Sequence, residues 1–166
     1  MSKLIIEKLA KSYQIESFDC GVAELNSFLI NHALTNQKAN SATTYVGLDG
    51  KKVIGYYSLT VASVIHAGAP SRVTKGLARH PVPVMLLARL AVDSECQSQG
   101  VGKGLLKNAL LKTAQAADIA GIRALLVHAK DDVAKDWYKS FDFEESHTDP
   151  LHLFLLIKDI QKIINQ

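Results

Sequence analysis

The sequence predicts an α/β (α+β) protein with a mixed sheet, and three observations lead to this prediction. Apolar, strand-like runs alternate with helical runs along the chain. The pair Asp49-Gly50 lies between two β-rich segments, which is typical of a tight antiparallel hairpin. A strand–helix–strand unit runs over residues 83–129, and such a unit requires a parallel crossover.

The composition is that of an ordinary folded protein. The 166 residues are 48% hydrophobic and carry a net charge of +3, and a chain of this length fits a single domain over residues 1–166. The apolar runs are strand-sized and too short to cross a bilayer, and the N-terminus does not resemble a signal peptide. Cys20 and Cys96 form no metal-ligand pattern. We therefore expect a cytoplasmic protein with reduced cysteines, no metal and no membrane partner.

The first half of the chain is expected to contain one helix and four strands. Strands are predicted over residues 4–9, 43–48, 52–65 and 83–92 from their apolar and β-branched residues. Within 52–65, Tyr56, Ser58 and Thr60 should share one face and Tyr57, Leu59 and Val61 the other. A helix is predicted over 21–34, capped by a side chain in 17–19, because apolar residues recur there at helical spacing. Residues 66–82 contain glycine and proline and should be irregular, with one helical turn.

The second half is expected to alternate helices and strands. A helix over 103–117 buries one apolar face, and a second helix over 131–141 is capped by Asp131 or Asp132. Strands are predicted over 122–129, 143–146 and 151–157, with a short helix over 159–164 at the end. The buried face of the first helix should consist of Leu105, Leu106, Ala109, Leu110 and Thr113.

The stretch Gln97-Ser98-Gln99-Gly100-Val101-Gly102-Lys103-Gly104 joins a strand to a helix. It is not a Walker A loop, because the required first glycine and the Ser or Thr after the lysine are missing. Its spacing also differs from that of the dinucleotide fingerprint. Free backbone amides at a helix N-terminus bind phosphate, and Lys103 adds a positive charge. The alternative is a turn in which the glycines serve only tight packing.

Gln97-x-x-Gly100-x-Gly102 resembles the pyrophosphate loop of the GNAT acyl-CoA N-acetyltransferases. The resemblance implies the GNAT fold, a mixed sheet of about six to seven strands splayed at the middle and flanked by about four helices. It also implies acetyl-CoA as co-substrate, with the pantetheine arm beside the preceding strand. The residues expected to bind it are Leu90, Ala91, Val92, Gln97, Ser98, Gln99, Gly100, Val101, Gly102, Lys103 and Gly104.

Four separated segments resemble a narrower group, the TacT/AtaT-like acetyltransferase toxins of bacterial type II toxin–antitoxin modules. That resemblance implies transfer of acetyl from acetyl-CoA to the α-amino group of an aminoacyl-tRNA, which blocks translation. It further implies a ribbon-helix-helix antitoxin and a homodimer. The segments are Phe18-Asp19-Cys20-Gly21 with Leu25-Asn26-x-Phe28-Leu29, the run from Pro83 to Asp93, Gly121-Ile122-Arg123 with Leu126-Val127-His128-Ala129, and Trp137-Tyr138 with Phe143.

Tyr138 occupies the position where the family places its acid tyrosine, so it is the expected catalytic residue. An α-amino group has a pKa of about 7.7–8.0, so part of it is already neutral near pH 7 and a strong general base is not compulsory. A protonated tyrosine can then supply a proton to the departing thiolate. Asp142 replaces a glycine that the family has after this helix; aspartate tolerates the left-handed conformation that the position requires. His128 is expected to serve core or wall packing, with a catalytic role as the alternative, and Cys96 to be an ordinary thiol.

Residues 61–92 contain no acidic side chain but several basic ones. We expect Arg72, Lys75 and Arg79 to contact tRNA phosphates, the alternative being a basic loop that is merely solvated, and the role of Arg89 stays open. Two other functions remain alternatives: a GNAT enzyme acting on a small-molecule or protein amine, and a non-catalytic acyl-CoA-binding regulatory module.

Overall fold

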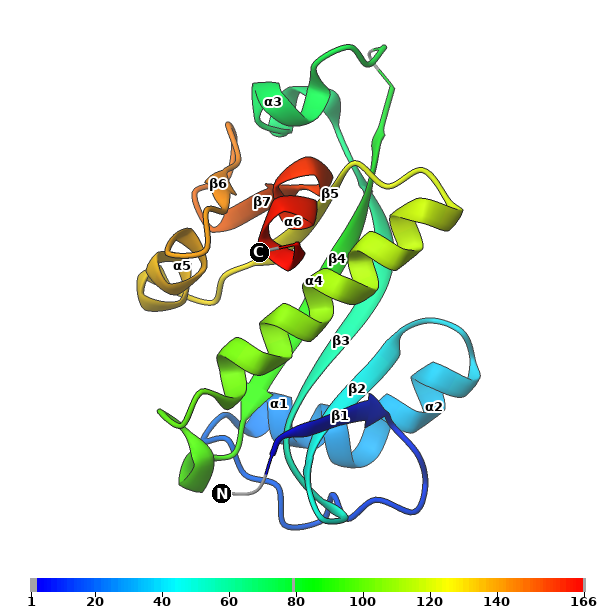
Figure 1. Cartoon of the computed structure of the whole chain (residues 1–166), viewed down its shortest axis with the longest axis vertical. Helices are drawn as coiled ribbons and strands as arrows, with labels where there is room; N and C mark the ends of the chain where they lie inside the picture. Colours follow the sequence, from blue (N-terminus) through cyan, green and yellow to red (C-terminus); the bar gives the residue numbers. More distant parts are fainter. Residues whose placement is uncertain (1–2, 79, 166) are drawn as a thin grey trace. The chain divides into compact units, whose positions relative to one another are not determined.

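The computed structural model describes residues 3–78 and 80–165. Within these residues the strands form a mixed seven-stranded sheet in the order β1-β2-β3-β4-β5-β7-β6 (Figure 1), so the predicted fold class is confirmed. The contacts divide the chain into two compact units, residues 3–60 with 88–109 and residues 61–87 with 110–165. β3, β4 and α4 each have residues in both units, and the two units are described in turn.

The first unit contains the antiparallel pairs formed by β1, β2 and most of β3. β1 (Ile5–Lys8) pairs with β2 (Thr43–Asp49), and β2 pairs with β3 (Lys52–Val64). The last pair of the β2–β3 register is Asp49 with Lys52, and Gly50 between them has φ of 63°. This positive φ is what a tight hairpin turn requires, so the hairpin predicted from Asp49-Gly50 is confirmed.

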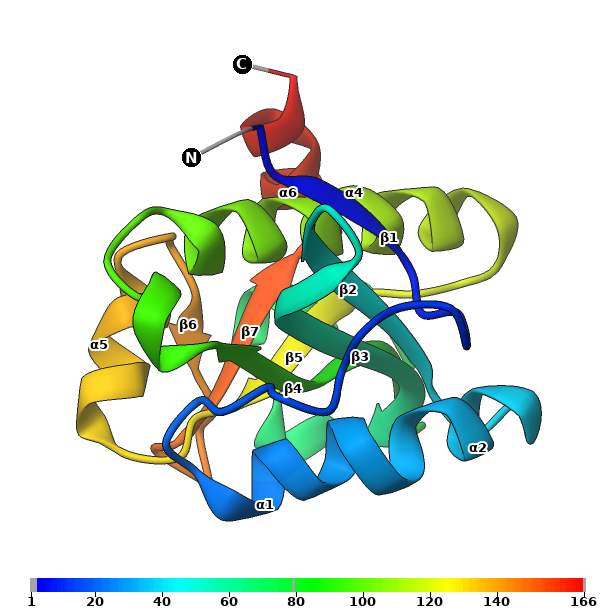
Figure 2. The ribbon, with the colours of Figure 1, turned by 90° about the horizontal axis from the view of Figure 1, so that it is seen from below.

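Adjacent tyrosines on β3 face opposite sides of the strand, as the alternation predicts. The Tyr56 ring lies 5.6 Å from that of Phe18 and 6.1 Å from that of Phe28, and its hydroxyl donates to the Leu25 carbonyl at 2.7 Å. The Tyr57 hydroxyl donates to Oδ1 of Asn108, on α4, at 2.6 Å. Figure 2 shows α1 and α2 below these strands and the start of α4 above them.

The N-terminal helix differs from its prediction in two ways. It consists of α1 (Ala23–Ser27), a π-helical turn η1 (Phe28–His32) and α2 (Ala33–Lys38). The predicted side-chain cap is wrong, because the N-cap is Val22 and makes no side-chain bond. The Asp19 carboxylate instead accepts from the Gly21 amide and from Asn26 Nδ2, both at 2.9 Å.

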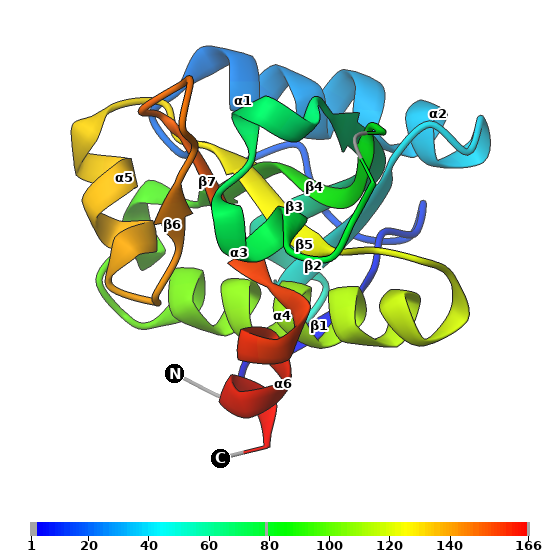
Figure 3. The same ribbon diagram turned by 90° about the horizontal axis from the view of Figure 1, so that it is seen from above.

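The second unit contains the parallel strand pair. β4 (Val82–Val92) pairs in parallel with β5 (Ala124–His128), from Met85 with Leu125 to Leu87 with Val127. β5 pairs antiparallel with β7 (His152–Leu156), which pairs with the short β6 (Glu144–Glu145). The helices in contact with β7 are α3 (Ser71–Thr74), α5 (Asp132–Lys139) and α6 (Ile157–Ile164), and Figure 3 shows where each of them lies.

The helix α4 (Val101–Ile119) starts inside the glycine-rich stretch, two residues before the predicted start at 103, so that Gly102, Lys103 and Gly104 belong to its first turn. All five residues expected on its apolar face are buried. The turns η2 (His66–Gly68) and η3 (Ser94–Cys96) complete the secondary structure. In the described part of the chain, no helix combines the length and apolar character needed to cross a membrane, and no three His, Cys, Asp or Glu side chains gather where they could hold a metal ion.

Candidate active site

The glycine-rich loop leaves the end of β4 through a turn that a buried carboxylate holds. Asp93 is only 5% exposed, and its side chain accepts the Glu95 amide at 3.0 Å and the Asp19 amide at 3.2 Å. The first bond caps η3, and the second ties the loop to the N-terminal segment. Sequence reasoning did not assign this role to Asp93, although an aspartate directly after a strand and before a turn is a capping signal.

Gln97 acts on the loop itself. Its Nε2 donates to the Val92 carbonyl at 3.0 Å and lies 3.5 Å from the Cys20 carbonyl. The side chain therefore fixes the loop against the end of β4. The side-chain amide nitrogen of Gln97 is thus used within the protein.

The loop backbone then takes a shape suited to an anion. Ser98 and Gly100 have φ of 65° and 83°, and residues 97–100 are exposed. The first intrahelical bond of α4 runs from the Gly104 amide to the Gly100 carbonyl at 3.0 Å, so the amides of Val101, Gly102 and Lys103 have no partner within the helix. Turns with left-handed residues that lead into a helix N-terminus bind phosphate.

The loop also leaves room for an anion. A Cβ built on Gly100 would meet no protein atom within 4 Å, so open space lies beside that backbone. Lys103 on the first turn of α4 is exposed and adds a positive charge to the helix N-terminus. The loop thus supplies backbone amides, a helix dipole and a cation to one anion, which is more than a packing turn needs.

The strand before the loop carries the residues predicted to accompany the pantetheine arm. Ala91 is buried, and Leu90 and Val92 are half-buried at the end of β4. The neighbouring Arg89 places its guanidinium carbon 3.7 Å from the centre of the Phe28 ring, which belongs to the π turn. This cation–π contact gives Arg89 a structural partner.

The predicted acid Tyr138 lies on α5, in the second unit. It is 9% exposed, and its ring packs edge-on against Trp137 at 5.0 Å and Phe143 at 5.4 Å. Burial raises the pKa of Tyr138 to about 12, so the hydroxyl is fully protonated near neutral pH. A protonated hydroxyl can act as a general acid toward a thiolate, and it cannot act as a general base until it has given up its proton.

Several contacts fix the position of α5. Asp131 caps the helix by accepting the Ala134 amide at 2.8 Å, as predicted. Lys135 and Lys139 both pair with Glu145 of β6, at 3.0 and 2.9 Å. After the helix, Asp142 has φ of 71°, so this aspartate does adopt the left-handed conformation expected there.

Two side chains that we did not assign to catalysis have clear surroundings. Burial, together with the nearby Asp93, raises the pKa of the Cys96 thiol, and a thiol with a raised pKa is a poor nucleophile. His128 lies exposed at the end of β5 and stacks on His152, with ring centroids 3.9 Å apart. This pair was not foreseen, and the strand register that creates it is not visible in the sequence.

The basic residues of the segment 61–92 differ in their surroundings. Arg72 donates to Asp159 through both terminal nitrogens, at 2.8 and 3.1 Å, and to Glu144 at 3.0 Å. The guanidinium is thus paired with two carboxylates of the same unit, an arrangement that the sequence did not predict. Lys75 is exposed, and the Arg123 side chain holds its loop through the Val73 and Lys75 carbonyls. Arg79 lies outside the described residues.

Comparison with known proteins gives consistent matches along the chain. A family model described as "Acetyltransferase (GNAT) domain" matches residues 40–145. A "tRNA-acetylating toxin" of Mycobacterium tuberculosis is 43% identical, over 95% of this chain and 94% of that protein.

Two solved structures are similar over nearly their whole lengths. AtaT complexed with acetyl-methionyl-tRNAfMet has a TM-score of 0.90 at 30% identity, covering 98% of this chain and 99% of that chain. A tyrosine-to-phenylalanine mutant of AtaT, bound to the C-terminus of the antitoxin AtaR and acetyl-CoA, has a TM-score of 0.83 at 28% identity, covering 99% and 100%. The chain therefore belongs to the GNAT family of acyl-CoA-dependent acetyltransferases, and within it to the TacT/AtaT-like toxins.

Proposed function

We propose that this protein transfers the acetyl group of acetyl-CoA to the α-amino group of an aminoacyl-tRNA and thereby blocks translation. The observation that supports acetyl-CoA as the acetyl donor is the set of free backbone amides at the start of α4, directly after Ser98 and Gly100 with their positive φ. Support for the acceptor half comes from the 43% identical tRNA-acetylating toxin and from the likeness to AtaT bound to an acetylated tRNA.

On the donor side, the amides of Val101, Gly102 and Lys103, which have no partner within the helix, bind the pyrophosphate together with the amides of the preceding loop residues. The Lys103 side chain adds its charge, and the Gly104 amide closes the first turn of α4 on the Gly100 carbonyl. The side chain of Gln97 keeps the loop closed on the end of β4. Backbone groups of Leu90, Ala91 and Val92 pair with the pantetheine arm. Acetyl-CoA supplies the activated thioester, and these residues bind and orient it.

On the acceptor side, the neutral α-amine attacks the thioester carbonyl and the C–S bond breaks. Tyr138 donates its hydroxyl proton to the departing sulfur, and the second amine proton restores the tyrosine. Because the pKa of Tyr138 is about 12, the hydroxyl holds its proton until charge develops on the sulfur. Positioning of the two reactants supplies much of the remaining rate enhancement.

Lys75 is the described basic side chain that we assign to the tRNA acceptor arm. It is exposed in a loop fixed by Arg123, and Arg79 follows it in the sequence. The variant Lys75→Glu should weaken tRNA binding and lower the slope of log Kd against log salt by about 1. Acetyl-CoA binding should not change. An unaltered salt slope would remove Lys75 from the tRNA surface.

A toxin of this kind acts with partners. We propose that an antitoxin, of the ribbon-helix-helix class, neutralises this protein, as the AtaT–AtaR complex suggests. We also propose a homodimer and a cytoplasmic location, where charged tRNA is found. Size-exclusion chromatography with light scattering, with and without the antitoxin, tests the assembly.

The proposed function is tested by incubating the protein with labelled acetyl-CoA and total charged tRNA. Deacylated tRNA from the same batch is the matched control, because it differs only in the missing amino acid. We expect label on N-acetyl-aminoacyl adducts after nuclease digestion and none on the control. Equal labelling of both pools, or of neither, contradicts the proposal.

A further inference from the structure

Two histidines from neighbouring strands form a stacked pair at one end of the second unit. His128 is the last residue of β5 and His152 is the first residue of β7, and the antiparallel register places them directly opposite each other. Their ring centroids are 3.9 Å apart and their planes differ by 13°. The pair is therefore a product of the strand register, held by backbone pairing on both sides.

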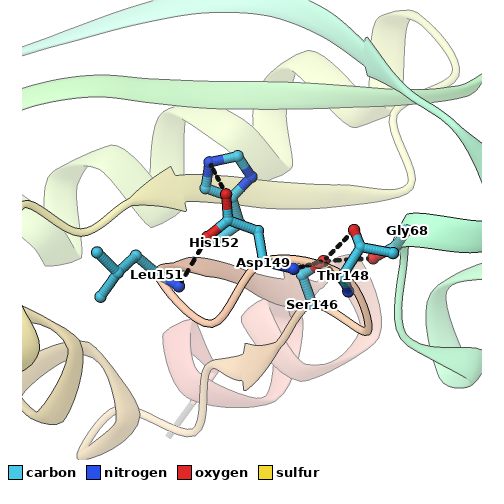
Figure 4. A network of polar contacts seen from close by, with 6 residues as sticks. All are labelled: Gly68, Ser146, Thr148, Asp149, Leu151 and His152. Carbon is cyan, nitrogen blue, oxygen red and sulfur yellow. Dashed lines mark hydrogen bonds and ion pairs between the residues drawn. The ribbon is translucent and has the colours of Figure 1, made fainter.

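An aspartate orients the His152 ring. His152 Nε2 lies 3.2 Å from Asp149 Oδ2, and the other oxygen of Asp149 accepts the Leu151 amide at 3.0 Å. The Asp149 carbonyl accepts the His152 amide at 3.1 Å. The carboxylate is thus fixed through both its side chain and its backbone (Figure 4).

The loop that carries Asp149 is fixed in turn. The Ser146 hydroxyl donates to the Gly68 carbonyl at 2.6 Å and accepts the Thr148 amide at 3.1 Å. It also lies 3.3 Å from the Asp149 amide, and Figure 4 shows these contacts meeting at Ser146. The Asp149 carboxylate, the His152 ring and the His128 ring therefore form a preorganised row in this order.

The row ends in a histidine whose nitrogens are available. Stacking uses the face of the His128 ring, and among the described residues no hydrogen bond to its ring nitrogens is present, while the residue is exposed. His128 also stands at the carboxyl end of a strand that pairs in parallel with β4, which is where ligands of open α/β sheets bind. The helix of Tyr138 begins four residues later, at Asp132.

We propose that His128 is a further catalytic residue, which accepts a proton from the α-ammonium group of the acceptor, and that His152 and Asp149 are the residues that position it. The inference rests on the proposed function, because the acceptor is the same amine. An N–H bond of the ammonium breaks, the proton bonds to an imidazole nitrogen of His128, and the electron pair left on the amine nitrogen attacks the thioester carbonyl. The exposed imidazolium then releases the proton to water.

The charges around His128 suit a base that is neutral near pH 7. Burial of one ring face and the adjacent His152 lower the pKa of His128, and Asp149 acts in the opposite direction. A free nitrogen is therefore available at a pH where most of the acceptor amine, with a pKa of about 7.7–8.0, is still protonated.

The test is the pH profile of kcat/KM with aminoacyl-tRNA for wild type and His128→Gln. Without the base, the variant can use only acceptor that is already neutral, so we expect a loss of about 15- to 30-fold at pH 6.5 and of about twofold or less at pH 8.5. The exposed His147→Gln, from the loop of Asp149, is the matched control and should follow wild type at every pH. If His128 only packs against the substrate, the variant would lose the same factor in kcat/KM at every pH, and that result overturns the inference.

The variant His152→Phe tests the positioning separately. It keeps an aromatic ring under His128 but removes the imidazole that lowers the pKa of His128, so the acid limb of the profile should move to higher pH with little loss at pH 8.5. An acid limb at the same pH as in wild type contradicts the inference. If His128→Gln fails to fold, the result for His152→Phe is the test. If wild type acetylates charged tRNA but both profiles match it, only the role of His128 is lost. If wild type is inert on charged tRNA, the proposed function fails and the inference fails with it.

Discussion

Replacing Tyr138 by phenylalanine removes one hydroxyl from the proposed site and leaves the packing intact. The ring is 9% exposed and packs against Trp137 and Phe143, and phenylalanine keeps both contacts. We expect the free energy of unfolding to change by less than about 1 kcal/mol. Tyr138→Ala would remove the ring and cost about 3–5 kcal/mol, so only the phenylalanine variant isolates the chemistry.

The expected kinetic effect follows from the state of that hydroxyl. With a pKa of about 12, Tyr138 is almost entirely protonated at pH 7.5, so every enzyme molecule has a proton ready for the thiolate. Loss of a general acid lowers kcat by about 10²- to 10⁴-fold, or about 3–5 kcal/mol in the activation barrier. The same pKa predicts no loss of wild-type kcat between about pH 7.5 and 9, because the hydroxyl stays protonated there.

The assay measures kcat and KM with charged tRNA and the Kd of acetyl-CoA by calorimetry. We expect the kinetic loss with the Kd of acetyl-CoA changed by less than about twofold, since the pyrophosphate loop is untouched. Tyr13→Phe is the matched control, because it removes a surface hydroxyl that donates to Glu7. Near-normal kcat in Tyr138→Phe would refute the assignment, and a matching loss in Tyr13→Phe would show that the effect is not specific.

Three further predictions follow from the loops and ion pairs. Gly100→Ala places a side chain at φ of 83° and should raise the Kd of acetyl-CoA at least about tenfold, whereas Gly76→Ala, at φ of 79°, carries similar backbone strain of about 1–2 kcal/mol and should leave that Kd unchanged. Asp142→Gly should raise the free energy of unfolding by about 0.5–1 kcal/mol, because glycine adopts the left-handed conformation freely, and chemical denaturation measures this; a lower value would count against strain at Asp142. Arg72 lowers the pKa of Asp159, so their pairing stabilises above about pH 4 and is lost as the pH falls through the lowered pKa; Arg72→Ala should flatten the pH dependence of unfolding in that range, and an unchanged slope would contradict the pairing.

The parts of the fold that depend on local patterns could be predicted from the sequence. Asp49-Gly50 predicted the hairpin, and the alternation along β3 placed Tyr56 and Tyr57 on opposite faces. The cap at Asp131 was also local, because a carboxylate three residues before a free amide is a signal within one turn. The start of α1 was missed because the Asp19 carboxylate does not cap the helix. It binds the Gly21 amide and the Asn26 side chain instead, and the sequence does not show which of these partners an aspartate before a helix will choose.

The parts that depend on register or on distant segments could not be predicted. The π turn over Phe28–His32 lies within a helical run, and the first buried residue after it is Ala33, five positions after Phe28, a spacing that the three- and four-residue pattern in the sequence does not reveal. Arg72 looked like a free cation because its partners Glu144 and Asp159 come from β6 and α6. His128 meets His152 only through the pairing of β5 with β7, and the antiparallel order of those strands had to be known first.

The most direct test of the proposed function is a competition for acetyl-CoA between three amines in one reaction. Wild-type protein is given total charged tRNA, a free amino acid amide and a peptide with a free N-terminus, all at equal concentration, and the acetylated products are counted by mass spectrometry. We predict that kcat/KM for charged tRNA exceeds that for either other amine by at least about 100-fold, since only the tRNA brings phosphates to the basic loop. Equal or higher kcat/KM for the amide or the peptide would contradict an aminoacyl-tRNA acceptor.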